Sequence, residues 1–237
     1  MQDLHKEAKG KEHPMGQAVA QTAEIFANLG FEIALGPELE TEWYNFDALN
    51  VPKDHPARDM QDTFWIKNEE GKVLRTHTTS VTARFLEKAA QENKIPCGYV
   101  SIGKVFRNEA TDGTHEMQFF QIDGFMIGAD ISLSHMKGVL THFYKKMLGS
   151  DTEIQFRPSF FPFTEPSVEV WAKFGDRWLE MMGGGMMHPN VLKNAGLDPE
   201  KVQGFAFGGG LDRIVMINRE IKDIRVFYSG DLRLNQF

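Results

Sequence analysis

The sequence predicts an α+β protein in which a mainly antiparallel β-sheet is flanked by helices. The candidate strands follow one another in runs, and helices come before, between and after those runs. Short turns rich in Gly, Asn, Asp and Thr join neighbouring strands, which is typical of antiparallel hairpins. A doubly wound nucleotide-binding fold would instead alternate single strands with single helices, so the topology disfavours that class.

The first part of the chain predicts one helix and one short strand. The helix begins at Pro14, which suits a first helical turn, and apolar residues recur at helical spacing between Val19 and Ala27. The helix ends before Gly30, and residues 31–35 follow as a strand. Residues 44–64 carry two prolines and clusters of polar side chains, so we expect a loop there.

The middle of the chain predicts a helix followed by a hairpin. A short strand runs into a helix from Thr79 to about Asn93, with Thr79 or Ser80 as its N-cap. Residues 98–107 and 115–128 are rich in β-forming side chains, and the segment between them is rich in turn residues. We therefore expect an antiparallel hairpin with a long loop.

The last part predicts three further strands between two helices. One helix covers Ser132 to Leu148, and another begins near Leu211 after a run of glycines. The expected strands are residues 152–158, 167–174 and 177–184. Gly175 and Asp176 form a hairpin-turn signal between the last two strands.

Composition and charge restrict the class of protein. The 237 residues suffice for one large domain, which we expect at residues 13–237 behind a tail or truncation stump at residues 1–12. The sequence has neither an apolar run of about eighteen residues nor an apolar signal-peptide segment, so we expect a cytoplasmic protein. A single cysteine, Cys97, excludes an internal disulfide and a multi-cysteine metal site. The net charge of −7 predicts that this chain alone binds nucleic acid weakly.

One face of the second hairpin strand combines aromatic and polar side chains. The alternation of a strand places Met117, Phe119, Gln121, Asp123 and Phe125 together. A ring for stacking beside an amide and a carboxylate suits the binding of a small polar molecule. A half-exposed sheet face with scattered apolar residues would show the same pattern, so both interpretations stay open.

Two other segments are candidates for a pocket. Arg107 ends the first hairpin strand, where its guanidinium could bind a phosphate through two hydrogen bonds, although surface arginines are common. Phe160, Phe161 and Phe163 crowd around two prolines, which confines them to an edge strand or a loop. These rings could wall a pocket or plug the core.

Three consecutive glycines at residues 208–210 are followed by Leu-Asp-Arg. A P-loop needs Lys and then Ser or Thr after its last glycine, and a dinucleotide-binding turn needs a βαβ unit, so neither interpretation fits. The remaining interpretation is a strand, a tight glycine turn and a helix whose first turn carries Asp212 and Arg213. Backbone without side chains would let a flat ligand lie against the strand, with Arg213 directed toward it.

Together these segments resemble the three signature motifs of class II aminoacyl-tRNA synthetases, and most closely the α subunit of phenylalanyl-tRNA synthetase. The resemblance extends from about Glu12 to Phe237. Its most specific segments are YNFDALN…DHPAR…DTFW, LRTHTTS, VFRNEATDGTHEMQFFQIDGF, RPSFFPFTEPS, GMMHPNVL, GFAFGGGLDR and DLRLNQF. The resemblance implies a class II-type antiparallel sheet, and a reaction in which ATP with Mg²⁺ activates phenylalanine before its transfer to tRNA(Phe).

The resemblance implies roles for residues around ATP. Arg107 would contact the α-phosphate and Arg213 the terminal phosphates, and these arginines would be the catalytic residues. Phe119 would stack on adenine, with Arg213 above or beside it. The other implied ATP contacts are Glu109, His115 and Gly210, and the implied Mg²⁺ ligands are Glu180 and Glu165.

The resemblance also implies a phenylalanine pocket and a subunit interface. Gln121 and Asp123 would hold the α-amino group, and Phe161 and Phe163 would meet the substrate ring edge to face. The other implied contacts are His77, Thr79, Ala206 and Gly208. Pro37 corresponds to the motif 1 proline at the family's subunit interface, so we expect a homodimer or a heterodimer with a β subunit.

Some positions depart from the family pattern. Asp123 stands where many bacterial members have Glu, and Gly183–Gly185 replaces a more usual Gly-Cys-Gly. Little precedes His13, where α subunits usually carry a helical arm that reaches tRNA, so we expect a catalytic core without that arm. Two other functions stay open, namely another class II ligase and a synthetase-like regulatory module that charges no tRNA.

Overall fold

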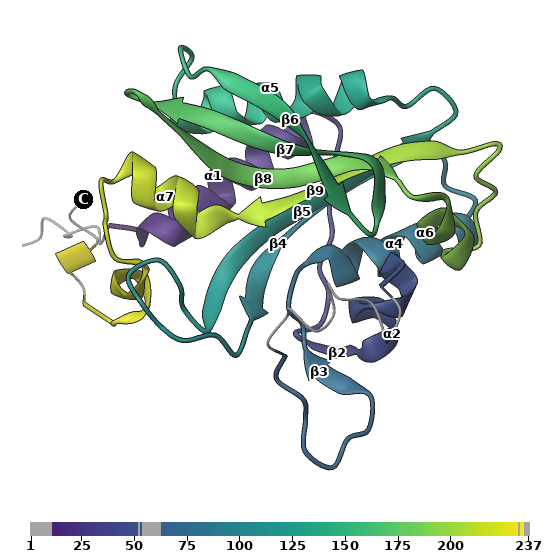
Figure 1. Cartoon of the computed structure of the whole chain (residues 1–237), viewed down its shortest axis with the longest axis horizontal. Helices are drawn as coiled ribbons and strands as arrows, with labels where there is room; N and C mark the ends of the chain where they lie inside the picture. Colours follow the sequence, from purple (N-terminus) through teal and green to yellow (C-terminus); the bar gives the residue numbers. More distant parts are fainter. Residues whose placement is uncertain (1–10, 52, 54–62, 232, 235–237) are drawn as a thin grey trace, which may run out of the picture.

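A large β-sheet organises the chain, and the computed structural model describes residues 11–51, 53, 63–231 and 233–234. Within these residues, seven strands form one sheet in the order β1-β4-β5-β9-β8-β7-β6, and β2 pairs with β3 beside it (Figure 1). The neighbours β1 and β4 are parallel, and the other neighbouring pairs of the large sheet are antiparallel. The predicted α+β class with a mainly antiparallel sheet is confirmed.

The elements that the sequence predicted have bounds within a few residues of those expected, and the structure adds short elements that were not predicted. The strands are β1 (Glu32–Ile33), β2 (Leu39–Thr41), β3 (Lys72–Leu74), β4 (Cys97–Phe106), β5 (Gln118–Gly128), β6 (Ile154–Phe161), β7 (Thr164–Phe174), β8 (Arg177–Met187) and β9 (Gln203–Gly210). The helices are α1 (Pro14–Asn28), α2 (Glu42–Asn45), α4 (Thr79–Gln91), α5 (Leu133–Leu148), α6 (Pro189–Asn194) and α7 (Leu211–Asn218), with 3-10 turns η1 (Asp47–Leu49) and η2 (Ile224–Tyr228).

Helices α1, α5 and α7 pack on one face of the sheet, here called the back face, and bury the main core. Phe26 of α1 lies between Phe143 of α5 and Phe207 of β9, with ring centroids 5.0 and 5.4 Å away. Burying each ring contributes roughly 1.5–3 kcal/mol. A Cβ on Gly124 would lie 2.5 Å from the Phe207 ring, so this glycine lets the ring rest on β5.

Helices α4 and α6 cover one end of the opposite face, here called the front face. Their buried apolar residues form a second cluster with Phe125 of β5 and Ala206 of β9. Beyond that end, β5, β9 and β8 line an open pocket. The sheet is therefore packed on its back face and carries the pocket on its front face.

Strand β6 lies at the edge of the sheet, as its prolines predicted. Pro158 sits opposite Val168 of β7, and a register shift follows between Ser159 and Phe161. An edge strand tolerates proline because the missing N–H would have had no partner on the outer side. The bulge re-aims the aromatic side chains that follow it.

The predicted glycine turn before α7 is wrong. Gly208–Gly210 continue strand β9, and none of the three has a positive φ angle. Each pairs with β5, as Gly208 does with Asp123 and Gly210 with Gln121. Gly208 and Gly209 are thus needed for space and not for backbone conformation, because a Cβ on them would lie 2.3 and 2.7 Å from a neighbouring atom, whereas a Cβ on Gly210 would meet nothing within 4 Å.

Two other local predictions need correction. The N-cap of α4 is Thr78, not Thr79 or Ser80, and no side chain makes a capping hydrogen bond there. The segment expected as a loop contains α2 and η1 instead, while residues 52 and 54–62 of it lie outside the described residues. Most of the tail expected at residues 1–12 also lies outside them. No helix in the described ranges is long and apolar enough to cross a membrane.

Candidate active site

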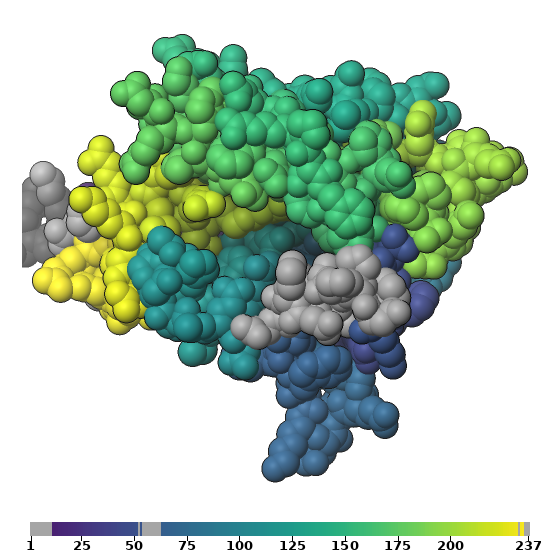
Figure 2. All heavy atoms as spheres, in the orientation of Figure 1, coloured from purple at the N-terminus to yellow at the C-terminus, as the bar shows by residue number. Residues whose placement is uncertain are grey.

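A large pocket opens on the front face, with a volume of about 1390 Å³. Figure 2 shows the surface hollowed between the green segments of β7 and β8 and the teal segments of β4 and β5. Fifteen residues singled out by the sequence line this cavity, which has room for two ligands side by side. They are His77, Thr79, Arg107, Glu109, His115, Phe119, Gln121, Asp123, Phe161, Phe163, Glu180, Ala206, Gly208, Gly210 and Arg213.

Strand pairing explains why these residues share one floor. Paired residues on neighbouring strands project to the same side of a sheet. Asp123 of β5 pairs with Gly208 of β9, which pairs in turn with Gly183 of β8. A Cβ on Gly208 would lie 2.3 Å from Asp123 Oδ1, and one on Gly183 would lie 2.6 Å from the Phe161 ring. The glycines therefore leave room for the functional side chains beside them.

Asp123 is a buried carboxylate at one end of the pocket. Its side chain accepts hydrogen bonds from the hydroxyls of Thr78 and Thr79, each 2.5 Å long, at the start of α4. Burial raises the pKa of Asp123 to about 7, although both hydroxyls, Arg107 and Arg75 act to lower it. Such a group attracts a cationic ligand, because a nearby positive charge stabilises the ionised form.

Two buried polar atoms beside Asp123 lack partners. Within the described residues, Gln121 Oε1 and His77 Nδ1 accept or donate no hydrogen bond. Burial, followed by the charge of Arg107, lowers the pKa of His77 to about 3, so the imidazole is neutral. Buried polar atoms of native proteins are nearly always paired, so these two atoms indicate a polar ligand.

Arg107 follows the end of β4, beside the start of β5, and its guanidinium lies over an aromatic ring. Its guanidinium carbon lies 5.0 Å from the centroid of Phe119, within the range of a cation–π contact. Arg107 Nε donates to the Thr76 carbonyl over 3.0 Å, and Nη1 lies 3.8 Å from Glu109 Oε1. Arg107 therefore lies over the ring for which the resemblance implied stacking on adenine.

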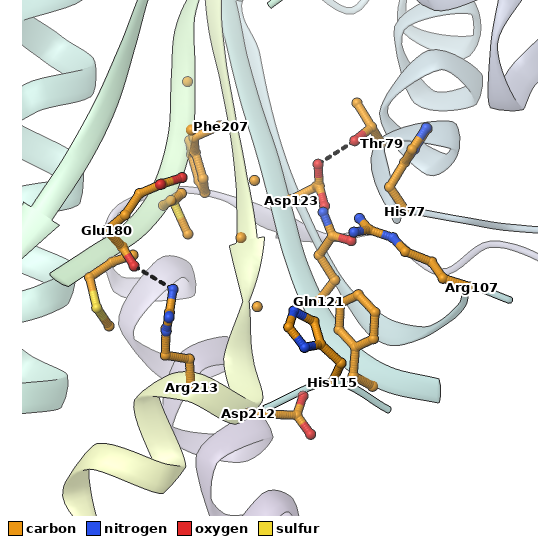
Figure 3. A pocket seen from close by; sticks show the side chains of 18 of the residues that line it. His77, Thr79, Arg107, His115, Gln121, Asp123, Glu180, Phe207, Asp212 and Arg213 are labelled. Carbon is orange, nitrogen blue, oxygen red and sulfur yellow. Dashed lines mark hydrogen bonds between the residues drawn. The ribbon is translucent and has the colours of Figure 1, made fainter. Parts of the chain in front are cut away.

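Arg213 lies across the pocket from Arg107, on the first turn of α7 (Figure 3). Its Nη1 donates to the backbone carbonyl of Glu180 on β8 over 2.9 Å. Burial and the nearby carboxylate of Glu169 raise the pKa of Glu180, while Arg213 lowers it. Arg107, which follows β4, and Arg213, on α7, thus approach the cavity from different elements, and the acidic side chain of Glu180 lines it as well.

Phe161 and Phe163 form an aromatic wall. Their ring centroids are 5.9 Å apart and their planes differ by 9°, so the two rings lie parallel. Ala206 lines the same part of the pocket with its small side chain. These rings and the small Ala206 side chain suit a planar apolar group, since aromatic rings offer their faces or edges to a third ring.

Comparison with known proteins identifies the relatives of this chain. A family model described as the class II core domain of tRNA synthetases (F) matches residues 2–237. The phenylalanine–tRNA ligase alpha subunit of Bacillus mycoides (strain KBAB4) is 49% identical over 241 residues, which cover 96% of this chain and 69% of the relative. This chain belongs to the phenylalanine–tRNA ligase alpha subunit family of class II tRNA synthetases. The alpha subunits of Bacillus cytotoxicus and Bacillus cereus (strain B4264) match with the same identity and coverage.

Two positions suggested by the resemblance to this ligase family lie away from the pocket. Glu165 is 75% exposed, and its Oε2 lies 3.5 Å from Nε2 of His188. It sits at the start of β7, whereas Glu180 of β8 pairs with Trp171 near the other end, so these two carboxylates are not brought together. Pro37 is exposed between β1 and β2, beside the edge of the sheet.

The sequence reasoning gave no role to two buried residues at this pocket, Thr78 and Asp212. Thr78 binds Asp123 from 45 residues away, a contact that only the fold creates. Asp212 is 2% exposed and accepts from the Phe120 N–H over 2.6 Å and from the Tyr228 hydroxyl over 2.5 Å. An acidic residue in the first turn of a helix was the signal available for Asp212, because such residues often bind backbone N–H groups.

Proposed function

We propose that this chain activates phenylalanine with ATP to give phenylalanyl-adenylate and pyrophosphate, and then transfers the phenylalanyl group to tRNA(Phe). The observation that carries the proposal is the joining of two kinds of site in one cavity. A buried carboxylate and an aromatic wall suit an aromatic amino acid, and two arginines beside them suit a polyphosphate. Family membership supplies the reaction that uses both ligands.

The phenylalanine end has a polar and an apolar part. In the proposal, Asp123 and Gln121 hold the α-ammonium, with His77 and Thr79 beside them. Oε1 of Gln121, which has no hydrogen-bond partner within the described residues, provides an acceptor for one N–H of the ammonium group. The other pocket residues receive the phenyl ring, and they are Phe161, Phe163, Ala206 and Gly208.

The ATP end is organised by the strand pair β5–β9 and by α7. In the proposal, Phe119 stacks on adenine, Arg107 contacts the α-phosphate, and Arg213 contacts the terminal phosphates. Gly210 would face the nucleotide, because a Cβ at this position would meet no atom within 4 Å. Glu109 and His115, which line the same end, complete the proposed contacts.

The chemistry needs no side-chain nucleophile. An oxygen of the phenylalanine carboxylate attacks the α-phosphorus, the bond from that phosphorus to the bridging oxygen breaks, and pyrophosphate leaves. A ribose hydroxyl of the tRNA then replaces AMP at the carbonyl carbon. Arg107 and Arg213 assist by neutralising phosphate charge and by alignment, which are the main sources of catalysis in such displacements.

The residues present fit a magnesium ion that accompanies ATP. Mg²⁺ takes one or two carboxylates and otherwise keeps water and phosphate oxygens, so it needs no protein cage. The described ranges contain no group of three or more His, Cys, Asp or Glu side chains that could hold a metal ion. Glu180 lines the pocket beside Arg213, and Glu169 is close enough to raise its pKa. We propose Glu180 as the protein ligand; the bound ion would neutralise phosphate charge.

We propose that a partner subunit binds the segment around Pro37, residues 33–39, here called the Pro37 segment. The apolar side chains flanking Pro37 are exposed, namely Ile33 by 43%, Leu35 by 78% and Leu39 by 39%. Exposed apolar residues along a sheet edge favour burial against another chain. The relatives are named alpha subunits, which supports a beta subunit as the partner.

A cytoplasmic location is part of the proposal, since the single cysteine suits a reducing compartment.

Amino-acid-dependent exchange between ATP and pyrophosphate tests the proposal. The chain, alone and with a phenylalanine–tRNA ligase beta subunit from Bacillus cereus, is assayed with Mg²⁺ and each of the twenty amino acids. We expect exchange with phenylalanine, about a hundredfold weaker exchange with tyrosine, and charging of tRNA(Phe). Exchange with a different amino acid would reassign the pocket to another class II ligase. Absence of exchange in both preparations, with ATP bound, would favour a regulatory module.

A further inference from the structure

A third arginine near the pocket, Arg75, has no place in the chemistry described above. It lies between β3 and α4, is 4% exposed, and does not line the cavity. Burial lowers the pKa of its guanidinium, and the carboxylates of Glu38 and Asp123 oppose that change. A buried arginine is costly to fold unless its donors are satisfied, so its contacts indicate what it does.

The contacts of Arg75 join two segments that are distant in the sequence. Its Nε donates to the carbonyl of Lys104 on β4 over 2.7 Å. Its Nη1 donates to the carbonyls of Gly36 and Pro37 over 3.1 and 3.3 Å, and its backbone N–H donates to that of Glu38 over 2.9 Å. One side chain therefore ties the exposed Pro37 segment to the strand that ends in the phosphate-binding arginine.

The strand has a matching adaptation at Gly103. A Cβ on Gly103 would lie 2.3 Å from Nη2 of Arg75, so the guanidinium occupies the space that a side chain would need. Gly103 has no positive φ angle, which means that its backbone does not require glycine. The glycine is explained by the arginine packed against it.

The backbone carbonyls of Arg75 and Thr76 also fix the position of Arg107. The Arg75 carbonyl accepts from the Phe106 N–H over 2.9 Å, directly before Arg107. The next carbonyl, that of Thr76, accepts from Nε of Arg107 over 3.0 Å. The orientation of the Arg107 guanidinium therefore depends on where residues 75 and 76 are held, and the Arg75 side chain holds them against β4 and the Pro37 segment.

We propose that Arg75 is a positioning residue for the adenylation step, which fixes Arg107 at the α-phosphate through the backbone of residues 75–76. The inference rests on the proposed function. A charged group that stabilises a transition state must be held within a fraction of an ångström, and a displacement of about 1 Å can cost a hundredfold in rate. A mobile Arg75 segment would loosen Arg107 without touching the phenylalanine pocket.

Three variants test the inference in the chain together with its beta subunit. Arg75→Lys keeps the charge but loses the forked donors, and Gly103→Ala displaces the guanidinium without changing any charge. Arg84→Lys is the matched control, because Arg84 donates to buried Glu40 and does not line the pocket. We expect the first two variants to lower kcat for pyrophosphate exchange at least tenfold, with KM for phenylalanine within twofold of the unmodified chain. Arg84→Lys should change kcat less than threefold.

The Kd for ATP, measured by titration calorimetry, separates the possible failures. Loss of position at Arg107 predicts at least fivefold weaker ATP binding in Arg75→Lys and Gly103→Ala, even if the unmodified chain shows no exchange. Kinetics and ATP affinity equal to those of Arg84→Lys would overturn the inference while leaving the proposed function intact. Exchange with an amino acid other than phenylalanine would overturn the proposed function, and the same variants would then be assayed with that substrate.

Discussion

The Cβ that Gly208 lacks would lie 2.3 Å from Oδ1 of Asp123, the carboxylate that closes one end of the pocket. The two residues are directly paired across β5 and β9, so the glycine at this position sets how far the carboxylate can lean over the sheet. The Thr78 and Thr79 hydroxyls bind the carboxylate from α4. Asp123 is therefore held between the N-terminus of α4 and Gly208 of β9.

Gly208→Ala should displace Asp123 and weaken phenylalanine binding. The added methyl group meets a side-chain oxygen, so the carboxylate must move and lose its hydrogen bonds to threonine. We expect KM for phenylalanine in pyrophosphate exchange to rise at least tenfold, with KM for ATP changed less. Gly138→Ala is the control, because a Cβ on this helical glycine meets nothing within 4 Å. An unchanged KM for phenylalanine in Gly208→Ala would show that Asp123 does not contact the substrate.

Titration of Asp123 should make phenylalanine binding depend on pH. Burial raises its pKa to about 7, so the carboxylate becomes neutral as the pH falls through that value. A neutral acid attracts the substrate ammonium much less, and kcat/KM for phenylalanine should fall up to tenfold per pH unit below about pH 7. Asp123→Glu, which keeps a carboxylate and lengthens it, should move the midpoint. A flat profile between pH 6 and 8 would contradict the assignment.

Asp123→Asn should stabilise the fold at alkaline pH while abolishing exchange. The pKa is higher in the folded state, at about 7, than the ordinary aspartate value of 3.8, so the folded state prefers the protonated form. The ionised carboxylate therefore costs stability above pH 7, and this cost fades as the pH falls toward 4. We expect the variant to gain up to about 4 kcal/mol of unfolding free energy at pH 8 and little at pH 5, measured by urea denaturation. A gain of equal size at both pH values would exclude this explanation.

Much of this site could be predicted from the sequence because its main strand has a period of two. That period placed Phe119, Gln121 and Asp123 on one face, and the structure brings all three into the pocket. The position of β9 between β5 and β8 could not be predicted from the sequence, since β9 begins 75 residues after β5 ends. For the same reason the glycines of β9 were interpreted as a turn, although Gly208 makes room for the Asp123 side chain of the neighbouring strand.

The start of α4 shows the same limit of local reasoning. Sequence preference predicted that a threonine hydroxyl would cap the helix, because such hydroxyls usually bind backbone N–H groups. In the fold, the hydroxyls of Thr78 and Thr79 donate to Asp123 instead. A buried carboxylate is a strong acceptor, so it directs the hydroxyl protons of both threonines toward itself. The contacts of Arg75 likewise depend on segments about 30 to 40 residues away along the chain.

Ala206→Gly should admit phenylalanines substituted at the para position. Ala206 lines the pocket in the row of β9 that pairs with Phe125 and Gly185, so removing its methyl group widens the floor. We expect kcat/KM for 4-chlorophenylalanine relative to phenylalanine to rise at least tenfold in pyrophosphate exchange. Ala172→Gly, at a buried strand position of the main core, controls for general loosening of the sheet. Equal selectivity in the two variants would place the substrate ring elsewhere.

Asp212→Asn should destabilise the fold and weaken ATP binding together. The carboxylate is buried and accepts from the Phe120 N–H and the Tyr228 hydroxyl, which joins α7 to β5 and to η2. An amide of the same shape replaces one acceptor oxygen by a donor, so one of these buried contacts is lost at a cost of about 1–3 kcal/mol. Arg213 follows directly in the same helical turn, and its placement should loosen as well. We expect a lower urea midpoint and a several-fold higher Kd for ATP, whereas Asp223→Asn, on the surface beside η2, should leave both nearly unchanged. A stability loss without any change in ATP affinity would show that Asp212 supports the fold and not the position of Arg213.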